Sequence, residues 1–140
     1  MIESFTGQHR WLSNFWPCRI VLDGKVYDSI EHAFQASKTR IEEERRDVRL
    51  AGSPGEAKRL GRRVTLREDW EEIKLPMMAE LVLQKFSKHA DLKEKLLATG
   101  DEEIVEGNSW RDSFWGVYKG SGKNHLGEII MRVREQLRRC

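Results

Sequence analysis

The stretch DSIEHAFQASK, residues 28–38, predicts a short amphipathic helix that carries three polar side chains on one stripe. Apolar or small residues recur along it at helical spacing and form the stripe that faces the core. Glu31, Gln35 and Lys38 lie about a quarter turn away, at the boundary where a cleft can form. Two interpretations stay open from this stretch alone. One is a functional site, and the other is a capping box at Asp28 or Ser29 followed by an ion pair on the helix surface.

Composition limits the classes of protein to which the chain can belong. A length of 140 residues suits one domain with a real core, and we expect a single domain over residues 1–140. With 25 basic and 23 acidic residues, the net charge of +2 does not by itself indicate a nucleic-acid partner. Cys18 and Cys140 stand far apart without metal-ligand spacing, which argues against both a disulfide framework and a zinc site.

The chain also lacks the sequence signals of a membrane or secreted protein. No apolar run approaches the roughly 20 residues that span a bilayer. The first residues lack the basic and apolar regions of a signal peptide. We therefore expect a soluble, cytoplasmic protein that has no membrane partner.

Capping and turn signals divide the rest of the chain into short elements. Asp23-Gly24 predicts a two-residue hairpin turn that feeds the first helix, and that helix is expected to continue from about Ile30 into the charged residues 42–46. Ser53-Pro54 begins a helix, and Pro76 predicts a break or kink near residues 74–75 of the next one. Asn124 is expected to cap the last helix, and strands are expected near residues 104–105 and 114–117. The fold class is a helix-dominated α+β domain with a small β-hairpin or sheet.

Chemistry-bearing residues gather in three further places. Trp70 and Trp115 stand among polar residues, and they are either stacking surfaces for a base or ordinary core. The loop 106–116 concentrates carboxylate, amide, guanidinium and indole groups, and it is either a site or an Asx-turn at a hairpin corner. The glycine-rich residues 120–124 could hold a phosphate or form a bare turn. The four histidines show no ligand pair, so no metal is expected.

Taken in order, these segments resemble the YbiA-like family, also called NADAR, over nearly the whole length. The resemblance depends on LSNFWP at 12–17, EHAFQA at 31–36 with Lys38, AKRLGR at 57–62, DSFWG at 112–116 and GKNHLG at 122–127. The family more often has tyrosine at the places of Trp16 and Phe34. The resemblance implies a YbiA-like fold and an N-glycosidase that needs no cofactor and no metal.

The implied reaction is hydrolysis of the bond between ribose C1′ and a nitrogen of the base. One branch of the family acts on phosphorylated ribosylaminopyrimidine intermediates of riboflavin biosynthesis, and another removes ADP-ribose from modified guanine in nucleic acid. A rival possibility is a noncatalytic sensor that binds ADP-ribose or a related nucleotide. The partner is thus a small ribosyl-phosphate substrate or ADP-ribosylated nucleic acid.

The chemistry of this reaction leads us to expect three residues at the reacting centre. Because charge develops on the sugar as the C1′–N bond breaks, a carboxylate can stabilise it or activate water. Glu31 is expected to face the ribose and Asp112 to orient water or a ribose hydroxyl, although the two roles can be reversed. Lys38 either keeps Glu31 ionised or attacks C1′ through an amine of lowered pKa.

The expected substrate-binding residues come from several segments. Tryptophans are expected to sandwich the base, amides to contact its polar edges and cations to hold the phosphate. The full set is Asn14, Phe15, Gln35, Lys58, Arg67, Trp70, Lys74, Asn108, Trp115, Lys123 and Asn124.

Overall fold

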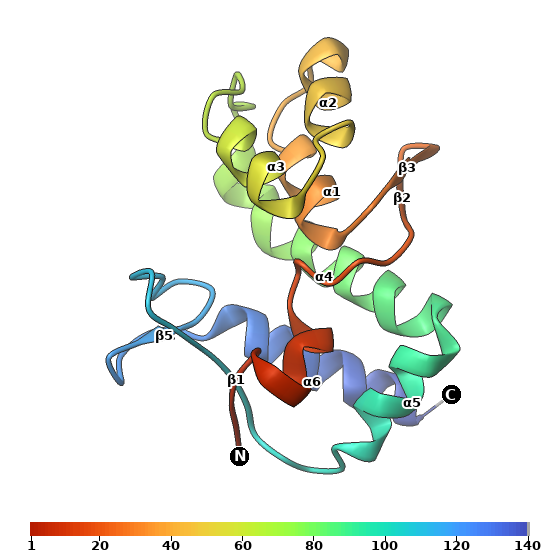
Figure 1. Cartoon of the computed structure of the whole chain (residues 1–140), viewed down its shortest axis with the longest axis vertical. Helices are drawn as coiled ribbons and strands as arrows, with labels where there is room; N and C mark the ends of the chain where they lie inside the picture. Colours follow the sequence, from red (N-terminus) through yellow and green to blue (C-terminus); the bar gives the residue numbers. More distant parts are fainter. Residues whose placement is uncertain (140) are drawn as a thin grey trace. The chain divides into compact units, whose positions relative to one another are not determined.

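The computed structural model describes residues 1–139, and Cys140, one of the two cysteines considered above, lies outside the described residues (Figure 1). The chain divides into two compact units: one holds residues 14–81, and the other holds residues 1–13 together with 82–139. In the first unit lie β2 (Ile20–Leu22), β3 (Lys25–Tyr27), α1 (Ile30–Ala36), α2 (Glu42–Arg49) and α3 (Pro54–Gly61). In the second lie β1 (Ile2–Ser4), the 3-10 helix η1 (Gly7–Leu12), α5 (Ala90–Ala98), β4 (Ile104–Asn108), β5 (Val117–Tyr118) and α6 (His125–Arg138). The boundary falls inside α4 (Trp70–Lys88).

A β-hairpin leads into the central helix of the unit formed by residues 14–81. Asp23 and Gly24 have φ values of 50° and 78°, which confirms the tight turn predicted between β2 and β3. The Ser29 side chain then accepts a bond from the backbone N–H of His32 and caps α1. All seven residues of α1 are buried, because α2, α3 and both hairpin strands pack around it.

The first helix is shorter than expected, and the prediction that it continues into residues 42–46 is wrong. It ends at Ala36, and α2 is a separate helix. Ser37 Oγ donates to the carbonyl of Phe34, and the carbonyl of Lys38 accepts from the backbone N–H of Arg67. Thr39 Oγ1 accepts from the backbone N–H of Ile41. These bonds satisfy the backbone groups that another helical turn would have used.

The next two helices, α3 and α4, each contain a proline on which a prediction was based. Ser53 Oγ accepts from the N–H of Glu56, and Pro54 is the first residue of α3, which confirms the predicted start. Of the predicted break or kink near residues 74–75, the break is wrong, because α4 runs through Pro76 as one helix of 19 residues. The kink stays a prediction.

The unit of residues 1–13 and 82–139 is built around a short parallel sheet. Its strand order is β1-β4-β5, and both pairs are parallel. The apolar face of α6 packs against β4, with Ile104 and Ile130 fully buried. Asn124 does not cap α6 with its side chain as predicted; it adopts φ 52° and bonds the backbone of Glu106 and Ile104 instead.

The two units together confirm the helix-dominated α+β class. No helix within residues 1–139 has both the length and the apolar composition needed to cross a membrane.

Candidate functional site

The carboxylate of Glu31 is buried in the first turn of α1. Only 8% of the residue is exposed, its backbone N–H donates to the carbonyl of Asn14, and its Oε2 accepts a 2.6 Å bond from Gln35 Nε2. Burial raises the pKa of Glu31, and the Gln35 bond and the charges of Lys58 and Lys38 only partly oppose this rise. The carboxyl group is therefore disposed to keep a proton that an exposed glutamate would lose.

The amine of Lys38 is shifted in the complementary direction. Lys38 is half-buried in the turn after α1. Burial lowers the pKa of Lys38, the charges of Arg62 and Lys58 lower it further, and Glu31 alone opposes them. An acid that tends to keep its proton and an amine that tends to lose one are a pair suited to proton transfer or to nucleophilic attack.

Gln35 joins this pair because helix α3 leaves room for it. Gln35 is buried, with only 6% of the residue exposed. A Cβ at Gly61 would overlap Gln35 Oε1 and would lie 2.6 Å from Gln35 Cδ. Among the residues that the structure describes, Gln35 Oε1 has no hydrogen-bond partner. The amide is thus held by its bond to Glu31 on one side and by contact with the α3 backbone on the other.

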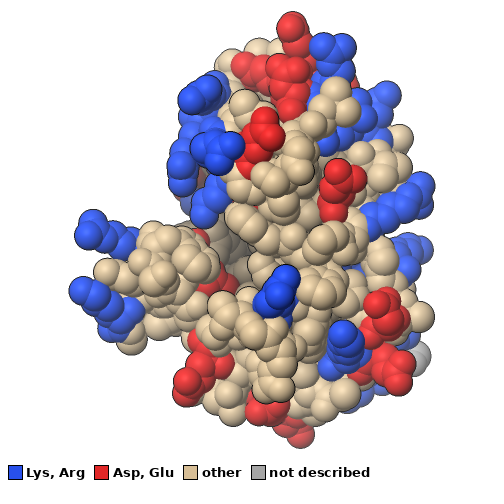
Figure 2. Space-filling model, viewed as in Figure 1, with Lys and Arg blue, Asp and Glu red and all other residues tan. Residues whose placement is uncertain are grey.

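Basic side chains line the end of α3 and the residues after it. On the face shown in Figure 2, blue side chains gather over the region of α3. Lys58 is half-buried, while Arg59, Arg62 and Arg63 are exposed. Lys58 and Arg62 are four residues apart, which places them on one helix face, and the charge of each acts on Lys38. Sequence reasoning missed Arg62, although its spacing from Lys58 was the signal that could have found it.

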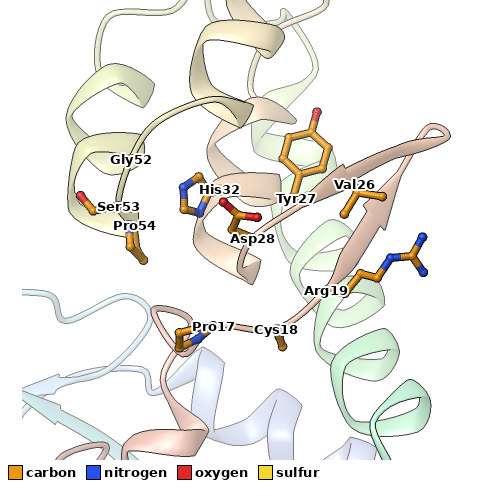
Figure 3. A pocket seen from close by; sticks show the side chains of 10 residues that line it. All are labelled: Pro17, Cys18, Arg19, Val26, Tyr27, Asp28, His32, Gly52, Ser53 and Pro54. Atoms are coloured by element: carbon orange, nitrogen blue, oxygen red, sulfur yellow. The ribbon is translucent and has the colours of Figure 1, made fainter.

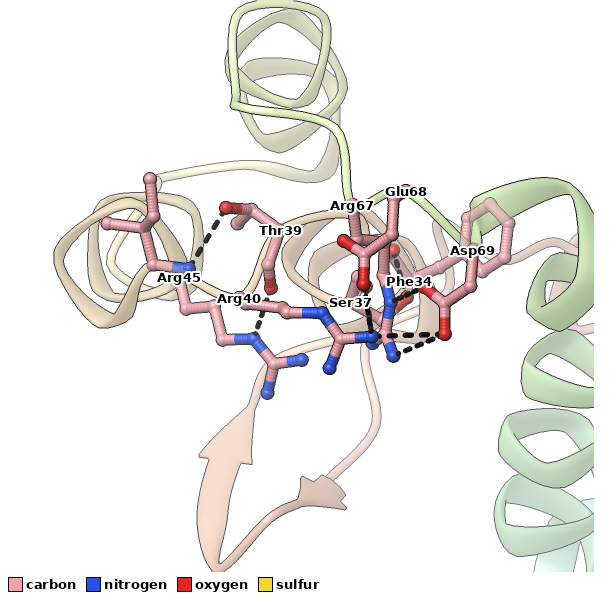
Figure 4. Close-up of polar contacts among 9 residues, drawn as sticks. Phe34, Ser37, Thr39, Arg40, Arg45, Arg67, Glu68 and Asp69 are labelled. Atoms are coloured by element: carbon pink, nitrogen blue, oxygen red, sulfur yellow. Dashed lines mark hydrogen bonds and ion pairs between the residues drawn. The ribbon is translucent and has the colours of Figure 1, made fainter.

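Arg67 is engaged in an ion-pair network that fixes the turn after α1. Its guanidinium donates to both carboxylate oxygens of Asp69 at 2.6 and 3.1 Å, and Arg40 donates to the same carboxylate at 3.1 Å (Figure 4). The backbone N–H of Arg67 donates to the carbonyl of Lys38 at 2.7 Å. Arg67, expected at a phosphate, therefore holds the chain segment that carries Lys38.

The other expected binding residues of this unit differ in how accessible they are. Trp70 is 7% exposed and packs on Phe34 with ring centroids 5.1 Å apart. Lys74 forms a 2.7 Å ion pair with Glu71. Asn14 Oδ1 is buried and has no hydrogen-bond partner within residues 1–139, whereas Phe15 is 41% exposed.

A separate pocket of about 630 Å³ opens at the N-terminal end of α1 (Figure 3). Its lining includes Tyr27, His32 and Pro54, but neither Glu31 nor Lys38. His32 bonds Ser29 Oγ at 2.8 Å through Nδ1 and the carbonyl of Ala51 at 3.0 Å through Nε2. Both ring nitrogens of His32 are thus used in holding the fold.

In the other unit, Asp112 organises the loop between β4 and β5. Its Oδ1 accepts from the backbone N–H groups of Phe114 and Trp115 at 3.1 and 2.9 Å. Asn108 binds the backbone of Asp112 in both directions, at 3.0 Å through Oδ1 and at 2.8 Å through Nδ2. The loop therefore contains the side-chain-stabilised turn that was one of the two interpretations of residues 106–116.

Three more expected binding residues lie around this loop. Trp115 packs edge-on against Phe114, with centroids 4.9 Å apart. Lys123 is exposed, and its Nζ lies 6.0 Å from the centre of the Phe114 ring. Asn124 is buried and binds the backbone of β4, so its side chain stabilises this unit.

Comparison with known proteins gives consistent results along the chain. The family model of the NADAR domain matches residues 3–138. An N-glycosidase of Nostoc punctiforme is 45% identical over 132 residues, which cover 90% of this chain and 84% of that protein. N-glycosidase YbiA of Escherichia coli is 42% identical over 130 residues, covering 89% of this chain and 79% of that protein. A riboflavin biosynthesis protein of Vibrio vulnificus is 41% identical over 92% of this chain, which corresponds to 36% of that protein.

A solved structure agrees with these sequence matches. The NMR structure of the E. coli protein YbiA superposes with a TM-score of 0.85 at 37% identity, covering 99% of this chain and 87% of that one. The family model, the related sequences and the solved structure each match about nine tenths or more of this chain. The chain therefore belongs to the NADAR domain family.

Proposed function

We propose that the protein hydrolyses the C1′–N bond of phosphorylated ribosylaminopyrimidines, the intermediates of riboflavin biosynthesis. Cleavage of an N-glycosidic bond is the class stated in the names of its relatives, and membership of the same family carries this class to the chain. A further relative is named a riboflavin biosynthesis protein, which supports the choice of substrate.

The observation that carries the proposal is the paired environment of Glu31 and Lys38. Burial raises the pKa of Glu31 and lowers the pKa of Lys38, so each group moves toward its neutral form. A protonated carboxyl can give its proton to the departing nitrogen, and a neutral amine can attack C1′. A noncatalytic sensor has no need of such a pair.

The proposed reaction begins when the C1′–N bond breaks and the leaving nitrogen takes the proton of Glu31. The neutral amine of Lys38 bonds to C1′. The C1′–O4′ bond of the ring then breaks as a proton passes from the attached nitrogen to O4′, which leaves a protonated Schiff base with the opened ribose. Water adds to C1′, the C1′–Lys38 bond breaks, the released proton returns to the Glu31 carboxylate, and ribose phosphate leaves with the Lys38 amine free again. In a second version, water attacks C1′ directly, and Lys38 acts only through its charge. The two versions differ in whether a covalent adduct of Lys38 forms.

The phosphate of the substrate is proposed to bind Lys58 and Arg62. Lys58 lies in α3 and Arg62 caps its C-terminal end on the same side, and their charges already act on Lys38. A dianionic phosphate beside them would also weaken their effect on the amine. Burial, the largest cause of the lowered pKa of Lys38, remains when the phosphate binds, so the amine is still disposed to be neutral when it attacks C1′.

The test is release of free base and ribose phosphate from the ribosylaminopyrimidine phosphates, with ADP-ribosylated DNA assayed in parallel. Release from the pyrimidine substrates supports the proposal. Release from the modified DNA alone would replace it with an ADP-ribosyl hydrolase. Binding of ADP-ribose without release from either substrate would favour the sensor.

A further inference from the structure

Helix α3 approaches α1 closely where Gly61 meets Gln35. A side chain at Gly61 would overlap Gln35 Oε1, and its Cβ would also lie 2.6 Å from Gln35 Cδ and 2.9 Å from Gln35 Cβ. Carbon atoms in good contact are about 3.5–4.0 Å apart, so the amide cannot keep its present place beside an alanine. Gly61 is not among the residues with positive φ, so the missing side chain, and not an unusual backbone, is the reason for glycine here.

Within residues 1–139, the amide of Gln35 makes a single hydrogen bond. Gln35 Nε2 donates to Glu31 Oε2 at 2.6 Å, and Gln35 Oε1 finds no partner among residues 1–139. An amide with bonds at both ends would keep its position after small displacements. This one depends on contact with the α3 backbone to keep its N–H group aimed at the carboxylate.

We infer that Gly61 is a positioning residue for Glu31 and acts through Gln35. By leaving space for the amide, it keeps the hydrogen bond that fixes Glu31 Oε2 and leaves Oε1 of the same carboxyl group for chemistry. The inference rests on the proposed function for its effect on turnover. Its effect on the titration of Glu31 requires no substrate.

The direction of that effect follows from the bond. Donation from Gln35 stabilises the ionised carboxylate, so it lowers the pKa of Glu31 against the larger effect of burial. If the amide is displaced, the pKa of Glu31 rises further. Bonds to charged groups are strong enough for their loss to reduce kcat about tenfold or more.

The first variant is Gly61→Ala, with Gly55→Ala on the same helix as its control. A Cβ at Gly55 would have Ser53 Oγ as its nearest neighbour at 3.9 Å, an ordinary contact. The titration of the Glu31 carboxyl carbon is followed by NMR with ¹³C-labelled glutamate. We expect a higher pKa of Glu31 in Gly61→Ala and the wild-type titration in Gly55→Ala.

Two further variants separate positioning from a general loss of packing. Gln35→Met keeps a side chain of similar length next to Gly61 but removes the donor, so it should raise the pKa of Glu31 even if Gly61→Ala fails to fold. In the double variant Gly61→Ala/Gln35→Met, the two shifts should not add, because both remove the same bond. In kinetics, kcat should fall and its pH profile should move with the titration of Glu31, while KM stays close to that of the wild type.

The outcomes are distinct. An unchanged pKa of Glu31 in Gln35→Met, or in a folded Gly61→Ala, overturns the inference, as do additive shifts in the double variant. A lower melting temperature without any change in titration overturns it too, since the role of Gly61 would then be structural. If the wild type cleaves no N-riboside while the titration shifts as expected, the proposed function fails and the inference stands.

Discussion

Replacing Glu31 by glutamine removes a charge and a proton but leaves nearly the same shape. The Oε2 of Glu31 accepts from Gln35 at 2.6 Å, and the amide oxygen of a glutamine can accept the same bond. The backbone bond from residue 31 to the carbonyl of Asn14 is also kept. General acid–base groups contribute about 10²- to 10⁴-fold to a rate. Because the rest of the site stays in place, kcat should fall by about that factor, while KM changes little.

The same substitution should not destabilise the fold at neutral pH. Since burial raises the pKa of Glu31, the folded state binds a proton more tightly than the unfolded state does. The stability of the wild type therefore declines as the pH rises from the ordinary value of 4.5 through the higher pKa of the folded state. Glu31→Gln lacks this decline. In urea denaturation its midpoint, relative to that of the wild type, should be higher at pH 7.5 than at pH 4.

The assay is release of base from ribosylaminopyrimidine phosphates by purified wild type and variant. Glu43→Gln, which changes an exposed carboxylate of α2, is the control and should keep full activity. Activity of Glu31→Gln within about tenfold of the wild type would remove its carboxylate from the mechanism. A urea midpoint that moved in the opposite direction between the two pH values would refute the argument from burial.

The other predictions concern Lys38, Asp112 and Asp69. Lys38→Arg keeps a positive charge but replaces the amine, whose pKa is lowered, by a guanidinium that stays protonated. Borohydride should therefore trap a sugar adduct on the wild type and none on the variant, as mass spectrometry can show; an adduct on the variant would place the covalent step elsewhere. Asp112→Asn keeps an Oδ1 that can accept from the backbone N–H groups of Phe114 and Trp115, so its melting temperature should equal that of the wild type while its turnover is lost. Asp112→Ala should lose turnover and also melt at a lower temperature. Full turnover by Asp112→Asn would assign Asp112 to structure alone. Asp69→Asn weakens the ion pairs that hold the segment after α1, so both melting temperature and kcat should fall at pH 7. The Arg67 bond lowers the pKa of Asp69, so this stability is present above the ordinary value of 3.8 and is lost as the pH falls through the lower folded pKa; a destabilisation that persisted in acid would contradict the mechanism.

Local signals in the sequence were sufficient for several elements. The Asp23-Gly24 turn and the start of α3 at Ser53-Pro54 need only residues that are neighbours in the chain, and both are confirmed. The helical spacing of Glu31, Gln35 and Lys38 also indicated one stripe. The Glu31–Gln35 bond and the mutual charge effects of Glu31 and Lys38 agree with it.

Features that depend on distant segments were not predictable in this way. The first helix ends just before Lys38, whose carbonyl accepts a hydrogen bond from the backbone N–H of Arg67. These two residues are 29 positions apart in the sequence. Gly61 leaves no pattern in the sequence beyond a glycine in a helical stretch, because its role depends on where Gln35 comes to lie. The side chain of Asn124 likewise serves β4 and not the helix that follows it.

The seven-residue length of α1 has a consequence for engineering of this protein. Isolated helices shorter than about 12–15 residues are marginal in water, so α1 exists only because its neighbours hold it. Glu31 lies in its first turn and Lys38 just beyond its end. The spacing between these two side chains therefore depends on the segments that hold α1 in place, which are the hairpin, α2, α3 and residues 67–69. Substitutions that shift the packing of those segments against α1 would change the spacing of the two proposed reacting groups without touching either of them, so a stability screen should measure turnover in every round.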